Sequence, residues 1–213
     1  MRRFNLRVRL PGFITALFKE ATWRMDKTRQ VVYLTFDDGP IPEVTPWVLD
    51  LLRKENIRAT FFCVGENVSR YPEVYQQILD DGHSVGNHTY NHWQGLKKSN
   101  REYFRNIEKA REYIDSDLFR PPHGWLRRSQ YFFLKRKYRI VMWDVISCDY
   151  DRGLKPEKVF RNIADFVRSG SIITFHDSLK AQRNLEEVLP KSIRWMKEQG
   201  YHFEAIPYKK VNE

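Results

Sequence analysis

The sequence predicts an α/β fold, a distorted parallel (β/α) barrel of about seven strands. Short apolar runs rich in β-branched and aromatic residues alternate with segments whose apolar residues recur at helical spacing, from residue 31 almost to the end of the 213-residue chain. A strand, helix, strand order implies right-handed crossovers between parallel strands. No repeat, low-complexity run or linker interrupts the alternation, so we expect one domain over residues 31–213, with an open doubly wound sheet as the alternative.

The first strand is expected within VVYLTFDDGP, residues 31–40. This run is apolar on both faces, which suits a parallel strand covered by helices on both sides. Asp37 and Asp38 would then lie at the carboxyl end of the strand, where such folds keep their chemistry. Two adjacent carboxylates can divide the work there, because one can bind a cation while the other stays an ionised base beside it. A capped turn is the structural alternative.

The later elements follow the same pattern. Helices are expected where apolar residues recur at intervals of three and four, over residues 44–52, 74–79, 103–114, 128–137, 156–169 and 185–196. Strands are expected at the short apolar runs between them, over residues 59–64, 83–86, 118–119, 140–145, 171–175 and 201–205. Pro121 and Pro122 end the strand at 118–119, because consecutive prolines cannot continue a ladder, and Gly170 ends the helix before 171–175.

Charge is concentrated at one end of the chain. Lys and Arg number 37 against 27 Asp and Glu, for a net charge of +10, and the first thirty residues contribute +6 through eight basic and two acidic side chains. This argues against a basic face spread over the whole domain, and without a nucleic-acid motif we expect no nucleic-acid partner. Cys63 and Cys148 lie in apolar runs without metal or redox spacing, so both are expected to be reduced and buried.

Residues 1–30 form a basic amphipathic segment. Its apolar stretch at 10–18 is interrupted by Pro11 and Gly12 and is shorter than the roughly twenty residues of a spanning helix. A short amphipathic helix is predicted over residues 13–24 by the spacing of Ile14, Leu17, Phe18, Ala21 and Met25. We favour docking of this helix on the barrel over peripheral contact with an anionic membrane. Without a convincing signal peptide, we expect the protein in the cytoplasm or at the inner face of the membrane.

A pair of histidines follows the third predicted strand. The sequence GNHTYNH places His88 and His92 four residues apart in a segment with little helical character. Two imidazoles and one carboxylate make a three-ligand set for a divalent metal that leaves a position open for water. A surface polar role for either histidine is the alternative. His83 stands at the head of a strand and is expected to be structural.

Other polar side chains also follow predicted strands. Arg120 in FRPPHG could hold a carboxylate through two parallel hydrogen bonds, and His176 in FHD would bring an imidazole to the same rim. Parallel strands end at one face, so one site is predicted from the residues that follow successive strands, namely Asp37, Asp38, His88, His92, Arg120, Asp149 and His176.

The ordered motifs TFDDGP, HTYNH, RPPHG, DY and FHD resemble those of the polysaccharide deacetylases of carbohydrate esterase family four, which share the nodulation-type chitooligosaccharide deacetylase homology domain. The resemblance covers residues 31–205. It implies that residues 31–213 form a metal-dependent hydrolase domain that removes N-acetyl groups from an amino sugar in a poly- or oligosaccharide or a glycolipid. The implied cofactor is zinc or a similar divalent metal.

The resemblance also implies roles for the motif residues. The metal ligands would be Asp38, His88 and His92. Asp37 would be the catalytic base that takes a proton from the attacking water, and His176 would be the acid that protonates the departing amine. Arg120 would orient Asp37, and Asp149 would support the charged form of His176.

Two positions depart from the family pattern. His123 stands where a tyrosine or a similar aromatic residue is usual, with a backbone N–H that helps to hold the oxyanion, and Tyr150 replaces the usual tryptophan near the fourth motif. Both are expected to contact substrate and to alter its choice. They keep open C–N hydrolysis of a non-sugar amide. A non-catalytic carbohydrate-binding protein is a further alternative, but a pure binder gains nothing from the base and acid at Asp37 and His176.

Overall fold

The computed structural model describes residues 5–211, and its centre is a curled parallel sheet. Seven strands follow the order β5-β4-β3-β2-β1-β7-β6, and β8 pairs with the start of β1. The strands are β1 (Val31–Asp37), β2 (Thr60–Cys63), β3 (Ser84–Asn87), β4 (Leu118–Phe119), β5 (Arg139–Ile140), β6 (Val145–Ile146), β7 (Ile172–His176) and β8 (His202–Phe203). Within the described residues the sheet is open between β5 and β6. The predicted distorted parallel barrel is therefore confirmed as a half-barrel of seven strands.

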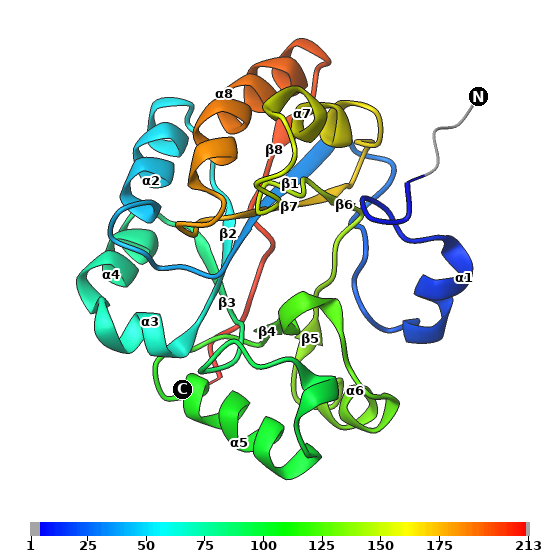
Figure 1. Ribbon diagram of the computed structural model, residues 1–213, viewed down its shortest axis with the longest axis vertical. Helices are drawn as coiled ribbons and strands as arrows, with labels where there is room; N and C mark the ends of the chain where they lie inside the picture. The colour runs from blue at the N-terminus through cyan, green and yellow to red at the C-terminus, as the bar shows by residue number, and fades with distance from the viewer. Residues whose placement is uncertain (1–4, 212–213) are drawn as a thin grey trace.

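Helices surround this sheet, as Figure 1 shows. They are α1 (Gly12–Thr15), α2 (Thr45–Lys54), α3 (Gly65–Arg70), α4 (Pro72–Asp80), α5 (Asn100–Arg111), α6 (Arg128–Leu134), α7 (Pro156–Ala164) and α8 (Gln182–Glu198), with 3-10 turns η1 (Ala16–Phe18), η2 (Gly95–Lys97) and η3 (Pro122–Gly124). Ser99 caps α5 in a capping box with Glu102, and prolines open α4 and α7. Among residues 5–211, none of the helices has both the length and the apolar character that a bilayer crossing requires.

Strand β1 is an interior strand of the sheet, and most of its residues are apolar. All seven are buried, and β1 pairs in parallel with β2 on one side and with β7 on the other. The register places Asp37 opposite both Phe62 and His176. The last residues of two neighbouring strands thus bring a carboxylate and an imidazole to the same edge, where the candidate site lies.

The strand predicted over residues 140–145 is wrong, because this stretch contains two short strands at opposite edges of the sheet. Strand β5 pairs with β4, and β6 pairs with β7. The N-terminal segment lies in the gap between β5 and β6. The Thr22 N–H donates to the carbonyl of Ile140 at 2.8 Å, and the Thr22 carbonyl accepts from the N–H of Met142 at 2.9 Å. The backbone groups between the two edges are thereby satisfied without a continuous strand.

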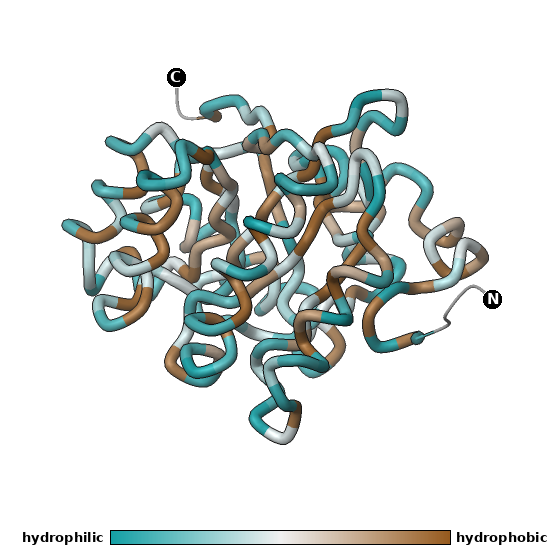
Figure 2. Tube along the Cα trace, turned by 90° about the horizontal axis from the view of Figure 1, so that it is seen from above, coloured by the Kyte–Doolittle hydropathy of each residue, from teal (hydrophilic) through white to brown (hydrophobic). Residues whose placement is uncertain are grey.

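The amphipathic helix predicted over residues 13–24 is also wrong in extent. Helical structure covers only α1 and η1, because the chain then extends to form the Thr22 bridge with Val141. Val8 and Ala21 are buried against the barrel, which supports docking of this segment. Phe13 and Leu17, however, are 74% and 70% exposed, so they do not cap the barrel. Figure 2 shows brown, apolar stretches of the chain at the right edge, near the N-terminus.

Smaller differences concern element ends. The helix predicted to residue 137 ends at Leu134, and α7 ends at Ala164, so Gly170 does not terminate it. Helix α3 was not predicted, because its six residues lack a helical stripe of apolar side chains. Cys63 and Cys148 are free and buried, as expected.

Candidate active site

The two histidines after β3 and the second aspartate after β1 converge at the carboxyl edge of the sheet. Oδ1 of Asp38 lies 3.1 Å from Nε2 of His92 and 3.8 Å from Nε2 of His88. One ligand atom from each of the three residues lies within 4.8 Å of the others. These nitrogen and oxygen donors form an Asp-His-His cluster of the kind that binds a divalent metal.

The protonation of His88 suits a metal ligand. Its Nδ1 lies 2.7 Å from the backbone carbonyl of Arg120, so Nδ1 carries the proton that it donates and Nε2 is left with a free lone pair. Burial lowers the pKa of His88 to about 4, which keeps the ring neutral. Burial acts to raise the pKa of Asp38, but the hydrogen bond from His92 and the charge at His176 outweigh it and hold that pKa well below its usual value. The cluster therefore presents a carboxylate and a neutral imidazole to a cation.

Unusual backbone conformations shape the loops that carry these ligands. Positive φ angles occur at Asp38 (87°), Thr89 (65°) and His92 (54°). Non-glycine residues rarely adopt this region, and it persists only where surrounding contacts hold it. Here Asn106 of α5 accepts hydrogen bonds from the N–H groups of both Tyr90 and Asn91 through its Oδ1.

Arg120 fixes the orientation of Asp37 at the end of β1. The guanidinium is completely buried, and its Nη1 donates to Oδ1 of Asp37 at 2.7 Å. Its other hydrogen bonds go to the Val141 and Met142 carbonyls and to the hydroxyl groups of Thr35 and Thr174. A buried ion pair with these additional bonds holds the carboxylate in one position.

The carboxylate of Asp149 fixes the orientation of His176. Oδ1 of Asp149 lies 2.8 Å from Nδ1 of His176, and Oδ2 accepts the His176 N–H at the same distance. Burial acts to lower the pKa of His176, but the charge and the hydrogen bond of Asp149 raise it to about 9. The ring is therefore protonated at neutral pH, as a general acid requires. The Tyr150 ring packs edge-on against it at 4.9 Å.

Asp177 is a functional candidate that the sequence analysis missed. It is completely buried, and its carboxylate accepts from the Gly39 N–H at 3.0 Å and from the Thr45 hydroxyl at 2.7 Å. These hydrogen bonds stabilise the turn after β1 that contains Asp38. Burial raises the pKa of Asp177 to about 8, against the effect of the same hydrogen bonds. Its place directly after His176 at a strand end was the signal that could have identified it.

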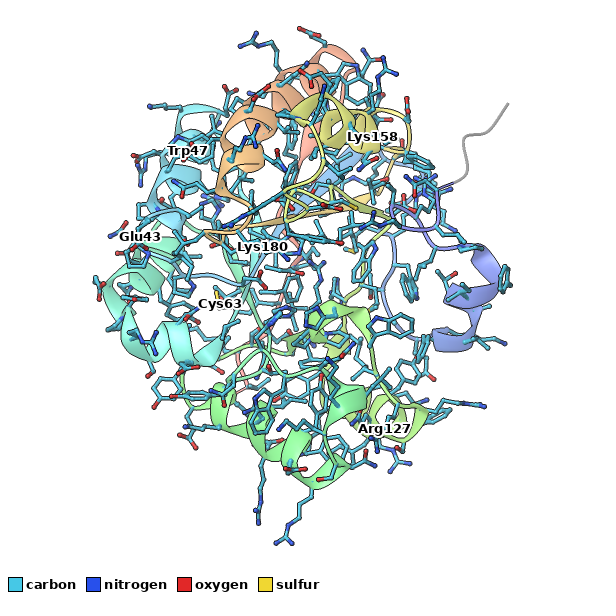
Figure 3. All side chains as sticks on the ribbon, in the orientation of Figure 1. Glu43, Trp47, Cys63, Arg127, Lys158 and Lys180 are labelled. Atoms are coloured by element: carbon cyan, nitrogen blue, oxygen red, sulfur yellow. The ribbon has the colours of Figure 1, made fainter. Side chains whose placement is uncertain are left out.

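A cavity of about 560 Å³ opens over these groups. Besides the candidate catalytic residues, its wall includes three aromatic side chains and two cations, Trp125, Trp143, Tyr150, Arg7 and Lys180. Figure 3 shows Lys180 near the middle of the ring of helices, close to Cys63 in this view. No pattern in the sequence pointed to Arg7, Trp125, Trp143 or Lys180, because none follows a predicted strand within a recognisable motif.

His123 lines the same cavity, and its ring lies 4.8 Å from that of His92. Its φ of 59° and the φ of 73° at Gly124 form a tight left-handed turn. A Cβ at Gly124 would overlap the Trp143 ring, so glycine is needed there. The His123 N–H is among the first of η3, where N–H groups lack acceptors within the helix. It is therefore suited to donate to a ligand.

The structure thus brings all the candidate residues of the sequence analysis to one edge of the sheet. Asp37, Asp38, His88, His92, His123, Tyr150 and His176 line the cavity. Arg120 and Asp149 lie behind Asp37 and His176. His83, expected to be structural, is buried away from this group and accepts the Ala59 N–H at Nδ1.

Known proteins resemble this chain in sequence and in fold. A family profile described as polysaccharide deacetylase matches residues 24–133. A peptidoglycan-N-acetylglucosamine deacetylase of Bacillus cereus is 32% identical over 192 residues, which cover 87% of this chain and 90% of the relative. A chitooligosaccharide deacetylase of Azorhizobium caulinodans is 34% identical over 162 residues, covering 72% and 77%. The crystal structure of the Bc1960 peptidoglycan N-acetylglucosamine deacetylase superposes with a TM-score of 0.85 at 30% identity, covering 92% of this chain and 95% of that one.

Proposed function

This chain belongs to the polysaccharide deacetylase family, and we propose that it is a metal-dependent enzyme that hydrolyses the N-acetyl group of an amino sugar in a glycan. One observation carries the proposal: Asp37 and His176, both held by buried partners, line the same cavity as the Asp38, His88 and His92 cluster. A base, an acid and a metal site around one cavity are the groups that amide hydrolysis needs.

The metal that we propose is zinc. The donor set of two imidazoles and one carboxylate is typical of catalytic zinc sites, and the neutral Nε2 of His88 fits such a ligand. When bound, the cation supplies Lewis-acid chemistry, because it polarises an amide carbonyl and makes water easier to deprotonate.

Two side chains at this site carry out the proton transfers, one as a base and one as an acid. Asp37, fixed in orientation by Arg120, takes a proton from the attacking water. The His123 N–H stabilises the negative charge that develops on the amide oxygen. His176, kept protonated by Asp149, donates a proton to the nitrogen as it departs. The products are acetate and a free amine on the sugar.

The cavity wall favours a sugar ring with an anionic substituent. Trp125 is 57% exposed at the rim, and Tyr150 presents a second aromatic surface beside His176. Flat aromatic faces suit the apolar faces of sugars. Arg7 and Lys180 add two cations to the same wall, although Arg7 also pairs with Asp151 at 3.0 Å. Similar proteins are named for activity on peptidoglycan and chitooligosaccharides. Of these, an acidic glycan such as peptidoglycan fits the two cations better.

Release of acetate tests the proposal. The zinc-loaded protein is incubated with N-acetylated peptidoglycan fragments, chitooligosaccharides and small cyclic amides, alongside Asp37→Asn and His176→Ala. We expect turnover on an acetylated glycan and a loss of about 10² to 10⁴-fold in each variant with metal content unchanged. Turnover only on the cyclic amides would favour a non-sugar amide hydrolase. Glycan binding without acetate release would favour a carbohydrate-binding protein, and near wild-type rates in a variant would refute its role.

A further inference from the structure

The N-terminal helical turns carry apolar side chains that the barrel does not cover. Phe13 in α1 and Leu17 in η1 are 74% and 70% exposed. On α6, the consecutive residues Phe132 and Phe133 are exposed as well. Single exposed apolar residues are normal on a protein surface, but a group of large ones indicates an interaction site.

Contacts between the two elements join these residues into one surface. The ring of Phe18, next to Leu17, packs edge-on against Tyr131 at 4.9 Å, and Tyr131 precedes Phe132. The Glu20 N–H donates to the Tyr131 hydroxyl at 3.0 Å. Phe13, Leu17 and Phe132 are therefore grouped as one face, which we call the apolar-basic face. Phe133 lies outside it, because its ring stacks on Phe104 of α5 at 4.3 Å. Figure 1 shows α1 at the right edge of the molecule and α6 below it.

The same face is strongly basic. Residues 12–20 and 127–139 contain seven Lys and Arg residues and a single acid, Glu20. Glu20 is already paired with Lys135. Two of the seven cations lie elsewhere, because Lys137 pairs with Glu108 of α5 and Arg139 donates to the Pro207 carbonyl. Lys19, Arg128 and Arg136 are exposed, and so is Arg127, whose guanidinium donates to the Leu96 carbonyl at 2.9 Å. Large apolar side chains beside exposed cations match the surface of an anionic bilayer, where apolar groups enter the headgroup region and cations meet lipid charge.

We propose that the apolar-basic face docks the protein peripherally on an anionic lipid bilayer. A second copy of the chain is a poorer occupant, because a symmetric contact would bring two such basic faces together. A nucleic acid would meet the cations but would leave Phe13 and Leu17 without an apolar environment. The bilayer satisfies both the charges and the apolar side chains.

The position of this face bears on access to the active site. Trp143 lines both the catalytic cavity and a second cavity that is walled by Pro11, Gly12 and Thr15 of the N-terminal segment. Docking through α1 would therefore place the catalytic opening near the membrane surface. This consequence rests on the proposed deacetylase function, but the docking itself does not.

Sedimentation with vesicles tests the docking. Full-length protein is mixed with vesicles of phosphatidylglycerol and phosphatidylcholine, or of phosphatidylcholine alone, at low and high salt. We expect binding to the anionic vesicles only, and weaker binding at high salt. The double variant Phe13→Ser, Leu17→Ser should lose about tenfold or more in vesicle affinity, because two buried apolar groups are removed. Lys19→Glu with Arg136→Glu should lose a comparable factor.

A matched control separates this effect from a general loss of surface apolarity. Leu179 is 53% exposed between β7 and α8, so Leu179→Ser makes the same change as Leu17→Ser outside the proposed face. We expect Leu179→Ser to bind vesicles like the wild type, and the melting temperature of the double variant to be unchanged. Wild-type protein that ignores anionic vesicles overturns the proposal, and so does equal binding by the double variant. A wild-type dimer that the double variant abolishes would assign the face to a second copy instead. These readouts need no turnover, so failure of the deacetylase assay leaves them intact.

Discussion

The carboxylate of Asp177 fills the space that a Cβ atom on Gly39 would need, and its Oδ1 accepts the Gly39 N–H at 3.0 Å. Gly39 directly follows the candidate metal ligand Asp38. The absence of a side chain at Gly39 thus lets a buried acid hold the ligand turn from behind. Groups that orient a metal ligand in this way commonly matter almost as much as the ligand itself.

Gly39→Ala should therefore weaken metal binding by about 10 to 100-fold, because the new methyl group displaces Asp177 and shifts Asp38. Zinc competition titration measures the loss. Gly12→Ala is the control, since a Cβ at Gly12 meets no atom within 4 Å. Wild-type zinc affinity in Gly39→Ala would show that Asp177 does not position the ligand.

His88→Ala should abolish stoichiometric metal, because it leaves only Asp38 and His92 of the cluster. His83→Ala is a matched change at a buried histidine outside the cluster. It should retain metal but lower the free energy of unfolding by about 1–3 kcal/mol, because the Ala59 N–H loses its acceptor. Metal analysis and urea denaturation of both variants separate a ligand from a structural histidine. Full metal occupancy in His88→Ala would remove it from the ligand set.

Asp149→Asn should shift the pH dependence of kcat/KM. A general acid must be protonated, and the Asp149 carboxylate raises the pKa of His176 to about 9 against the effect of burial. Activity that needs protonated His176 therefore falls as pH rises through that pKa. Without the negative charge the pKa drops, so the alkaline limb of the profile should move to lower pH. An unchanged alkaline limb would mean that another group sets it.

Asp144→Asn should lower the free energy of unfolding in a pH-dependent way, because Asp144 ties the N-terminal segment to the rest of the fold. Asp144 pairs with Arg9 at 3.1 Å and with Arg168 at 2.6 Å. Burial acts to raise its pKa, but the hydrogen bonds of Arg168 and Ser171 outweigh it and lower the pKa from its ordinary value. A depressed pKa stabilises the folded state above the unfolded value of about 4, and this contribution disappears as pH falls through the folded pKa.

The measurement for Asp144→Asn is the free energy of unfolding against pH. We expect a deficit relative to the wild type at pH 7 that shrinks as pH falls below about 4. Asp50→Asn is a suitable control, because Asp50 is an exposed partner of Arg53 on α2 and exposed ion pairs contribute little. A deficit that stays constant down to low pH would mean that packing, not charge, accounts for the role of Asp144.

Local sequence patterns were enough to predict the alternation of strands and helices and the sheet edge at which the candidate site lies. Period and composition are local properties, and parallel strands must end at one face, so Asp37, His88, Arg120 and His176 could be placed together from their positions in the chain. The motif order added the family. These inferences needed only the spacing of residues along the chain.

The way in which distant segments meet could not be predicted from local patterns. Residues 140–145 look like one strand because their apolar run is continuous, but pairing with β4 at one end and β7 at the other divides them. Thr22 bridges the gap between β5 and β6 through hydrogen bonds to residues more than a hundred positions away. Arg7 and Lys180, which are far apart in the sequence, line the same cavity. Such contacts depend on register and packing between remote elements, which local periodicity does not encode.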